Sequence, residues 1–227
     1  RILPVFDSGE TVGQLWYTMP CIDGESLRDL LQRSGPLPIA DALHITQDVA
    51  DALIYAHAEG VVHRDIKPEN IMLSRGHALV TDFGIARAAH LEPDDLVSSQ
   101  GTALTVAGHT MGTPAYMSPE QATGETRLTG QSDLYSLACV TYEMLVGAPP
   151  HAADSPIEML SRRVMAPPPL ASERRAGIPA SLDTALMHAL ATLPDQRTAS
   201  VAAFVDALTA PELTPSGPMA ATEAIPT

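Results

Sequence analysis

A loop in the first half of the chain carries residues whose types and spacing suit phosphoryl transfer. The segment from His63 to Asn70 reads His-Arg-Asp-Ile-Lys-Pro-Glu-Asn, so that it presents Asp65, Lys67 and Asn70 at fixed offsets. In phosphoryl transfer a carboxylate orients the attacking hydroxyl, a cation offsets developing charge, and an amide oxygen can hold a metal ion. Further along, Asp82 opens the triplet Asp-Phe-Gly and adds a second carboxylate that can bind a metal.

These motifs occur together in the protein kinases, and the chain resembles that family. The pattern His-Arg-Asp-x-Lys-x-x-Asn, the triplet Asp-Phe-Gly and the later Ser118-Pro119-Glu120 stand in the family's order. The resemblance covers about residues 1–208, and over 112–121 it is greatest to the bacterial eukaryotic-like Ser/Thr kinases. It implies an α+β, protein-kinase-like fold with a mainly helical C-terminal lobe and short hairpins, and with most of the N-terminal lobe missing.

The resemblance gives each residue of the two motifs a role. Asp65 would orient the substrate hydroxyl, and Lys67 would stabilise the transferred phosphoryl group. Asn70 and Asp82 would bind Mg²⁺ through oxygen. Thr113 would lie beside Asp65, and this threonine and Lys67 are both typical of kinases that phosphorylate Ser or Thr. ATP and Mg²⁺ are therefore the expected cofactors.

Four apolar positions match the family's adenine site. Met19 would be the gatekeeper, and Met72 would pack under the adenine, although a methionine there also suits an ordinary core. The carbonyl of Pro20 and the N–H of Ile22 would hydrogen-bond the adenine at the hinge between the lobes. Pro20 is compatible with this role because proline lacks the N–H but keeps its carbonyl.

Five further positions match structural supports of the family. His63 would pack against the metal-binding triplet, which includes Phe83, rather than act as a base. Asp133 would hold the backbone of the catalytic loop, and Arg197 would pair with the carboxylate of Glu120. A buried carboxylate needs such partners, because its burial without hydrogen bonds is costly.

The periodicity of apolar residues predicts the elements that position these motifs. Residues 2–6 and 14–19, separated by the turn-like sequence Asp-Ser-Gly-Glu, predict one β-hairpin, and residues 71–73 and 78–81 predict another. Helices are predicted over 25–33, from about 38 to 60, and over 129–146, 156–165, 182–193 and 199–208. The helix over 129–146 is apolar nearly all round and should be buried.

The resemblance also divides the chain. Residues 1–22 would hold the last two strands of the N-terminal lobe and the hinge, 23–210 the C-terminal lobe, and 211–227 a disordered linker rich in Pro, Thr and Ala. The chain opens at Arg1 and contains no Gly-rich phosphate loop, strand lysine or helix glutamate partner of the family. We therefore expect a fragment that binds ATP weakly and transfers little phosphate by itself.

The segment between Asp82 and Glu120 corresponds to the family's activation segment and implies regulation by phosphorylation. Arg64 and Arg87 would face a phosphorylated threonine, whose charge would pair with both guanidinium groups and order the segment. Thr105 is the best match by its distance from Gly112, and Thr110 and Thr102 are the alternatives. The other interpretation is that these threonines only suit a flexible loop and that Arg64 is solvated.

Composition limits the partners. A net charge of −14, from 13 basic and 27 acidic residues, argues against nucleic acid and anionic membranes as partners. No apolar run approaches the roughly 18 residues of a membrane span. The two distant cysteines, Cys21 and Cys139, are expected to be reduced thiols, as in the cytoplasm. The expected partners are proteins with Ser or Thr acceptors and a second copy for trans-autophosphorylation; a membrane tether beyond this chain is an open alternative.

Two other function classes remain open. One is a non-catalytic, pseudokinase-like binding module, which the sequence upstream of Arg1 would distinguish from an enzyme. The other is a small-molecule phosphotransferase of the same fold, such as the antibiotic kinases, but those lack the segment 112–120 and Arg197. Apart from His63, the histidines show no metal-ligand spacing with Cys or Asp and are interpreted as surface or core residues: His44, His57, His77, His90, His109, His151 and His188.

Overall fold

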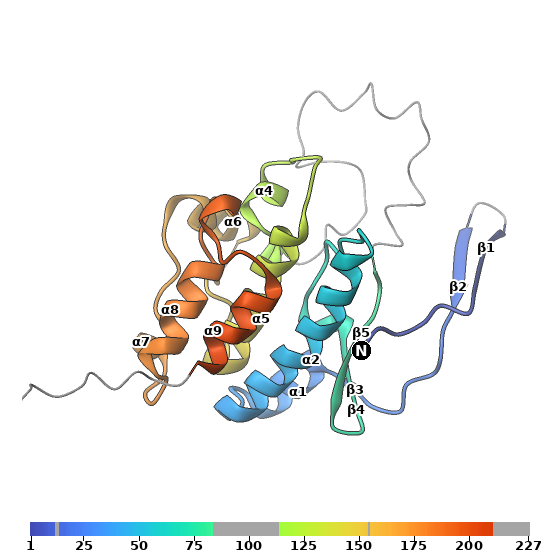
Figure 1. The fold of residues 1–227 in the computed structure, drawn as a ribbon, viewed down its shortest axis with the longest axis horizontal. Coiled ribbons are helices and arrows are strands. Elements are labelled where there is room, and N and C mark those ends of the chain that lie inside the picture. The colour runs from blue at the N-terminus through green and yellow to red at the C-terminus, as the bar shows by residue number, and fades with distance from the viewer. Residues whose placement is uncertain (12–13, 84–113, 154, 211–227) are drawn as a thin grey trace, which may run out of the picture.

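The computed structural model describes residues 1–11, 14–83, 114–153 and 155–210. Two small antiparallel sheets and a larger group of helices make up this part of the chain (Figure 1). One sheet pairs β1 (Asp7–Thr11) with β2 (Gln14–Thr18), and the other has the order β3 (Glu25–Ser26), β4 (Ile71–Ser74) and β5 (His77–Val80). The helices are α1 (Leu27–Ser34), α2 (Ile39–Ala58), α4 (Pro119–Ala122), α5 (Gly130–Val146), α6 (Pro156–Met165), α7 (Ala171–Arg174), α8 (Ala180–Ala189) and α9 (Val201–Thr209). Single 3₁₀ turns, η1 (Pro68–Asn70), η3 (Pro114–Tyr116) and η4 (Pro194–Gln196), lie between them.

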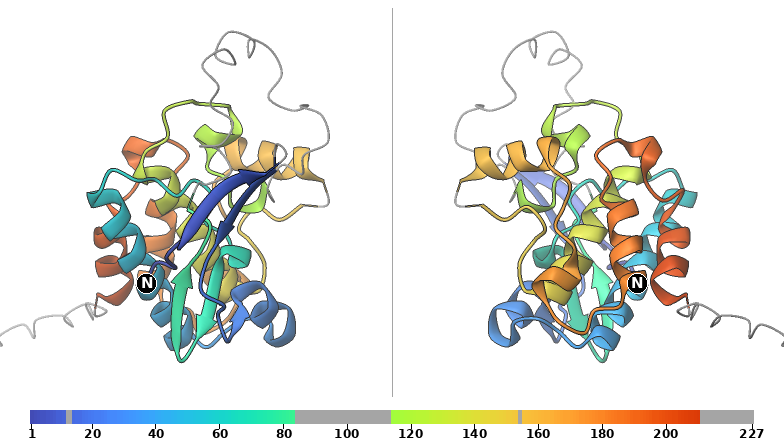
Figure 2. Two further views of the ribbon diagram at one scale, coloured as in Figure 1. Left: turned by 90° about the vertical axis from the view of Figure 1, so that its right-hand side faces the viewer. Right: turned by 90° about the vertical axis from the view of Figure 1, so that its left-hand side faces the viewer.

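Helix α5 is the centre of the fold, as its sequence predicts. Thr129 caps its first turn by accepting from the backbone N–H of Gln131, and Gly147 ends it with a left-handed φ of 92°. All its residues from Ser132 to Leu145 are buried. Helices α7, α8 and α9 pack against one side of it (Figure 2), and α2 packs against another. The helix can therefore carry polar side chains such as Asp133 into the interior.

Helix α2 places residues 61–70, the predicted catalytic loop. Its buried face includes Ala42, Val49 and Leu53, and each fully buried side chain of the size of leucine contributes about 1.5–3 kcal/mol. The helix ends beside Gly60, whose φ of 76° is easily adopted only by glycine. The chain leaves α2 directly into residues 61–70, so the packing of α2 against α5, α9 and β5 fixes where that loop begins. Among the described residues, no helix combines the length and the apolar character that crossing a bilayer requires.

The two hairpins differ in how well the sequence predicted them. The hairpin of β4 and β5 is confirmed; Arg75 and Gly76 both have positive φ, of 53° and 78°, as a two-residue hairpin turn requires. The prediction of the other hairpin was wrong in its first strand, because β1 lies over residues 7–11, where most of the residues were expected to form the turn. Residues 1–3 instead run beside β5, where Leu3 N donates to Val80 O at 3.0 Å. Strand β1 is mostly exposed, so no apolar alternation marks it.

Candidate active site

The side chains of the catalytic loop form one connected cluster. Lys67 Nζ donates to Asp65 Oδ2 at 2.6 Å, and Asn70 Nδ2 donates to Asp65 Oδ2 at 3.1 Å and to Asp65 O at 2.8 Å. The turn η1 makes this possible, because it brings Asn70 back over the backbone of Asp65. Since the amide nitrogen of Asn70 faces Asp65, its amide oxygen faces away from that carboxylate and can serve as a metal ligand. The Asp65 side chain itself is half exposed, so a substrate hydroxyl can reach it.

Asp82 stands two residues beyond the end of β5, in a left-handed backbone conformation that is uncommon for residues other than glycine. Its φ is 59°, and such strained positions are common at functional sites. Thr81 N donates to Asn70 O at 2.9 Å, which ties the approach to Asp82 to the end of the catalytic loop. Tyr17 Oη donates to Asp82 Oδ1 at 3.0 Å. This hydrogen bond and, to a smaller extent, burial raise the pKa of Tyr17. The two expected metal ligands are thus held by one backbone connection, and both offer the oxygen atoms that Mg²⁺ prefers.

Asp133 anchors the beginning of the catalytic loop. This fully buried carboxylate accepts from His63 N at 2.8 Å, from Arg64 N at 2.7 Å and from His57 Nε2 at 2.7 Å. Arg64 has a φ of 71°, so its bond to Asp133 Oδ1 holds a left-handed residue directly before Asp65. The participation of His57 was not predicted, because 76 residues separate it from Asp133.

His63 is placed by hydrogen bonds at both ring nitrogens. Nδ1 accepts from Asp65 N at 3.2 Å, which leaves Nε2 as the protonated nitrogen, and Nε2 donates to Thr81 O at 2.8 Å. The ring also packs on Phe83, with 4.5 Å between the ring centroids. Because the side chain is fully buried and both ring nitrogens are hydrogen-bonded, His63 positions the loop against residues 81–83 and has no ring nitrogen left to act as a base.

Glu120 and Arg197 form a buried two-point ion pair. Arg197 Nη1 donates to Glu120 Oε1 at 2.9 Å and Nη2 to Oε2 at 2.7 Å, while Ser132 Oγ donates to Oε1 at 2.7 Å. Burial alone would raise the pKa of Glu120, but the bonds from Arg197 and Ser132 outweigh it and hold the pKa below its ordinary value. The Arg197 guanidinium also lies 4.9 Å from the ring centroid of Tyr135. The pair joins α4 to the segment between α8 and α9.

Two arginines that were not predicted as site residues bind the residues of η3 itself. Arg28 binds Glu69 at 2.8 Å and Glu143 at 2.9 Å and also donates to Tyr116 Oη, so α1, η1, α5 and η3 meet at one guanidinium group. Arg163, only 1% exposed, donates to the backbone carbonyls of residues 114 and 115. Their partners lie 41 to 115 residues away, so no local pattern in the sequence marks them.

Among the described residues, the predicted adenine-site residues make no side-chain hydrogen bond to this cluster. Met19, Pro20 and Ile22 lie half-buried between β2 and β3, and Met72 pairs with Ser26 and Leu79 in the sheet. The remaining predicted residues fall outside the described part of the chain: Arg87, Thr105, Thr110 and Thr113.

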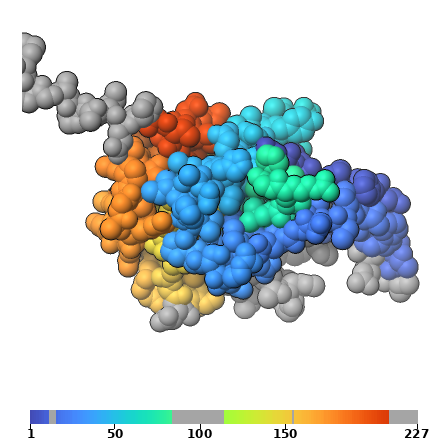
Figure 3. Space-filling view, turned by 90° about the horizontal axis from the view of Figure 1, so that it is seen from below, coloured from blue at the N-terminus to red at the C-terminus, as the bar shows by residue number. Residues whose placement is uncertain are grey.

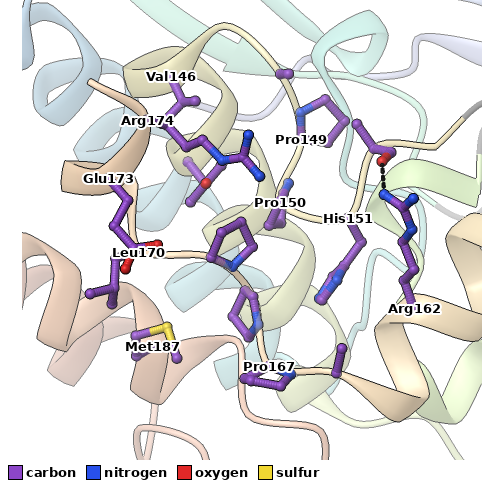
Figure 4. A pocket seen from close by; sticks show the side chains of 16 residues that line it. Val146, Pro149, Pro150, His151, Arg162, Pro167, Leu170, Glu173, Arg174 and Met187 are labelled. Carbon is purple, nitrogen blue, oxygen red and sulfur yellow. Dashed lines mark hydrogen bonds between the residues drawn. The ribbon is translucent and has the colours of Figure 1, made fainter.

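A cavity of about 850 Å³ lies apart from these residues, among α5, α6, α7 and α8 (Figure 4). Its lining includes Tyr142, His151, Arg162 and Arg174. Burial, together with Arg163 and Arg162, lowers the pKa of His151 from 6.5 to about 4. Tyr142 Oη is buried and has no hydrogen-bond partner among the described residues. None of the lining residues belongs to the catalytic loop, so the cavity is separate from the candidate site.

Comparison with known proteins agrees with this geometry. The sequence model of the protein kinase domain matches residues 1–205. The chain is 41% identical over 201 residues to the serine/threonine-protein kinase PknB of Mycobacterium leprae, and 44% identical over 218 residues to PknD of Mycobacterium tuberculosis. These matches cover 86% and 93% of this chain, but the chain spans only 31% of the length of either relative.

A solved structure shows the same similarity in three dimensions. The crystal structure of the PknI kinase domain of Mycobacterium tuberculosis superimposes with a TM-score of 0.69 at 33% sequence identity. That match covers 91% of this chain and 70% of the PknI chain. The fold, the motifs and these relatives agree: the chain belongs to the protein kinase domain family.

Proposed function

We propose that the protein transfers the γ-phosphoryl group of ATP to Ser or Thr residues of other proteins. The observation that carries the proposal is the hydrogen-bonded cluster of Asp65, Lys67 and Asn70. Asp133 fixes the backbone immediately before this cluster by accepting from the N–H groups of residues 63 and 64. A pseudokinase would not need a carboxylate, an ammonium group and an amide in contact and open to substrate. Membership of the kinase family and the Ser/Thr kinases among the relatives support the same activity.

Each group has a defined task in this proposal. Asp65 would accept a hydrogen bond from the substrate hydroxyl and align its oxygen for attack. Lys67, held 2.6 Å from Asp65, would place its positive charge beside the transferred group as negative charge develops there. The amide oxygen of Asn70 and the carboxylate of Asp82 would hold Mg²⁺, which when bound neutralises the phosphates of ATP.

We also propose how the chain is divided into lobes, which residues it phosphorylates and in which compartment it acts. Residues 23–210 would form the large lobe, with residues 1–22 contributing strands and the hinge of the small lobe, and 211–227 would be a linker. The acceptors would be Ser or Thr of protein substrates, as Lys67 favours, including those of a second copy of the protein. Two cysteines without a disulfide, exposed Cys21 and buried Cys139, suit a cytoplasmic domain.

Regulation would come from phosphorylation of the activation segment. Arg64 is exposed next to Asp65, and its backbone is fixed by Asp133 and by Gln121, whose Nε2 donates to Arg64 O at 2.7 Å. A phosphate on Thr105 or Thr110 would pair with this guanidinium group. Mapping the phosphorylated residues by mass spectrometry and assaying Arg64→Ala would test this part alone.

The activity is tested with the protein expressed from its full gene, radiolabelled ATP, Mg²⁺ and peptides that offer Ser, Thr or Tyr. Asp65→Asn should lower turnover by roughly 10²–10⁴-fold, the range for loss of a general base or its orienting role. Asp51→Asn, which removes an exposed carboxylate from α2, is the matched control and should keep full turnover. Equal turnover of Asp65→Asn and the parent would contradict the assignment, and phosphorylation of Tyr peptides alone would contradict the substrate class.

A further inference from the structure

Two histidines outside the catalytic loop meet at one buried carboxylate. His44 and Asp48 lie one turn apart on α2, and His77 opens β5. His77 Nδ1 is 3.3 Å and His44 Nε2 is 3.9 Å from Asp48 Oδ2, and the three side-chain atoms all lie within 4.8 Å of one another. The sequence analysis interpreted these histidines as ordinary surface or core residues and did not predict this arrangement. It did not use the four-residue spacing of His44 and Asp48, and no feature of the sequence indicates that β5 packs against α2.

We propose that His44, Asp48 and His77 bind a divalent transition-metal ion, and we take Zn²⁺ as its representative. Two imidazoles and one carboxylate are a ligand set that suits Zn²⁺, whereas Mg²⁺ prefers oxygen ligands only. With three protein ligands, a tetrahedral ion keeps one position for water. This site is separate from the expected Mg²⁺ ligands in residue identity and in chemistry, so it does not depend on the proposed kinase activity.

The distances are close to those that the ion requires. With metal–ligand bonds of about 2.0–2.1 Å, the ligand atoms of a tetrahedral site lie about 3.3 Å apart. The contact between His77 and Asp48 already has this length, and that between His44 and Asp48 is longer. The side chain of His44 is 57% exposed and that of His77 is 49% exposed, so both rings can adjust and an ion can enter from solvent.

The carboxylate is held ready on the side away from solvent. The Asp48 side chain is only 3% exposed, and Oδ2 accepts from the backbone N–H of Ala78 at 2.8 Å. This bond fixes the carboxylate in the way that outer-shell hydrogen bonds orient metal ligands. In the space-filling view, the green surface of the β4–β5 hairpin lies against that of the neighbouring blue helices (Figure 3).

Two existing contacts and the protons on the imidazole rings compete with the ion. Arg1 Nε lies 2.8 Å from Asp48 Oδ1, which weakens the attraction of the carboxylate for a cation. His44 Nε2 lies 3.1 Å from Gly76 O, and this hydrogen bond must be given up when Nε2 binds a metal. The nitrogen of each ring must also be free of its proton, so binding should weaken as the solution becomes acidic. These costs predict a site of moderate affinity rather than a permanently loaded one.

Binding would join α2 to β5 through one ion. The strand continues through Val80 to Asp82, and α2 continues into the catalytic loop, so the ion would fasten together the two elements that lead into the site. An ion that binds only the folded chain raises its stability by mass action. At a hundredfold excess of Zn²⁺ over its dissociation constant, the midpoint of thermal unfolding should rise by about 5–10 °C.

The test uses the full chain with Cys21→Ser, which removes the exposed thiol as a competing ligand. After chelation and dialysis, Zn²⁺ is titrated by calorimetry, and the unfolding midpoint is measured with Zn²⁺ and with Mg²⁺. We expect one site per chain for Zn²⁺. His44→Gln and His77→Gln should each weaken it at least about tenfold and remove the shift of the midpoint.

His188→Gln is the matched control, because His188 is an exposed histidine near the end of α8 and is not part of the cluster. It should leave Zn²⁺ binding unchanged. The visible spectrum of bound Co²⁺ gives a second measurement, since its bands should be altered by His44→Gln and His77→Gln but not by His188→Gln. Absence of a Zn²⁺ site, or a site that survives either cluster substitution, would overturn the proposal.

Discussion

The replacement Asp133→Asn is the sharpest test of how the fold holds the catalytic loop. It keeps the shape of the side chain but removes its charge and turns one oxygen into an amide donor. In the parent, Oδ1 accepts from Arg64 N, and Oδ2 accepts from His63 N and His57 Nε2. An asparagine that keeps the two bonds at the Oδ2 position must point its NH₂ group at the N–H of Arg64.

The size of the effect follows from these three bonds. One buried N–H left without an acceptor costs about 1–3 kcal/mol, and two bonds that lose a charged acceptor weaken by about 1 kcal/mol each. The smaller cost of burying a neutral side chain offsets part of this loss. We therefore expect a decrease of about 2–4 kcal/mol in the free energy of unfolding. For a chain of this size, that lowers the unfolding midpoint by about 5–15 °C.

Urea unfolding followed by circular dichroism measures this change, and amide hydrogen exchange at residues 63 and 64 measures its location. Asp183→Asn is the control, because that buried carboxylate accepts one backbone bond, from Ser172 N at 3.2 Å, which an amide oxygen can keep. We expect it to cost at most about 1 kcal/mol. If Asp133→Asn cost no more than Asp183→Asn, or if residues 63 and 64 stayed fully protected, the anchoring role of Asp133 would be refuted.

Three further replacements test other parts of the structure. Arg197→Ala should lower the free energy of unfolding by about 3–5 kcal/mol, because it leaves the buried carboxylate of Glu120 without its cation. The double variant Arg197→Ala, Glu120→Gln should recover part of that loss in the same urea assay. The pKa of His151 is lowered to about 4, so between pH 6.5 and pH 4 the unfolded state takes up a proton that the folded state does not, and the free energy of unfolding falls as the pH falls through that window. His151→Gln should remove this dependence, which amounts to up to about 3 kcal/mol between the two pH values. An unchanged slope of stability against pH would contradict this. Tyr142→Phe should leave stability unchanged or raise it by about 1 kcal/mol, since it removes a buried hydroxyl without a partner among the described residues, and a clear loss of stability would mean that the hydroxyl is bound.

Much of the fold could be predicted because its main elements carry local signals. Helix α5 combines an apolar sequence with a threonine cap at its start and Gly147 at its end, and the β4–β5 hairpin has Gly76 in its turn. Strand β1 carries no such signal. Within the described part of the chain it pairs only with β2, and a strand exposed on both faces needs no alternation of apolar residues.

The site divides in the same way. Asp65, Lys67 and Asn70 lie within six residues, so their spacing in the sequence is enough to predict that their side chains meet. The groups that hold them come from distant positions: Asp133 reaches His63 across 70 residues, and Arg28 reaches Glu143 across 115. Such pairs are created by the packing of helices, and a single sequence has no period that relates them. The approach of His77 to Asp48 was not predicted for the same reason.

The pairing of Glu120 with Arg197 has a consequence during synthesis of the protein. The two residues are 77 positions apart, so at about 5–20 residues per second the ribosome adds Arg197 about 4–15 s after Glu120. Throughout that delay, the segment around α4 cannot bury its carboxylate against the guanidinium group that neutralises it. We expect this part of the nascent chain to stay open until residue 197 has left the exit tunnel. Ribosome-bound chains stalled before and after that point should therefore differ in how readily proteases cleave near residue 120, and equal cleavage would show that the segment closes without Arg197.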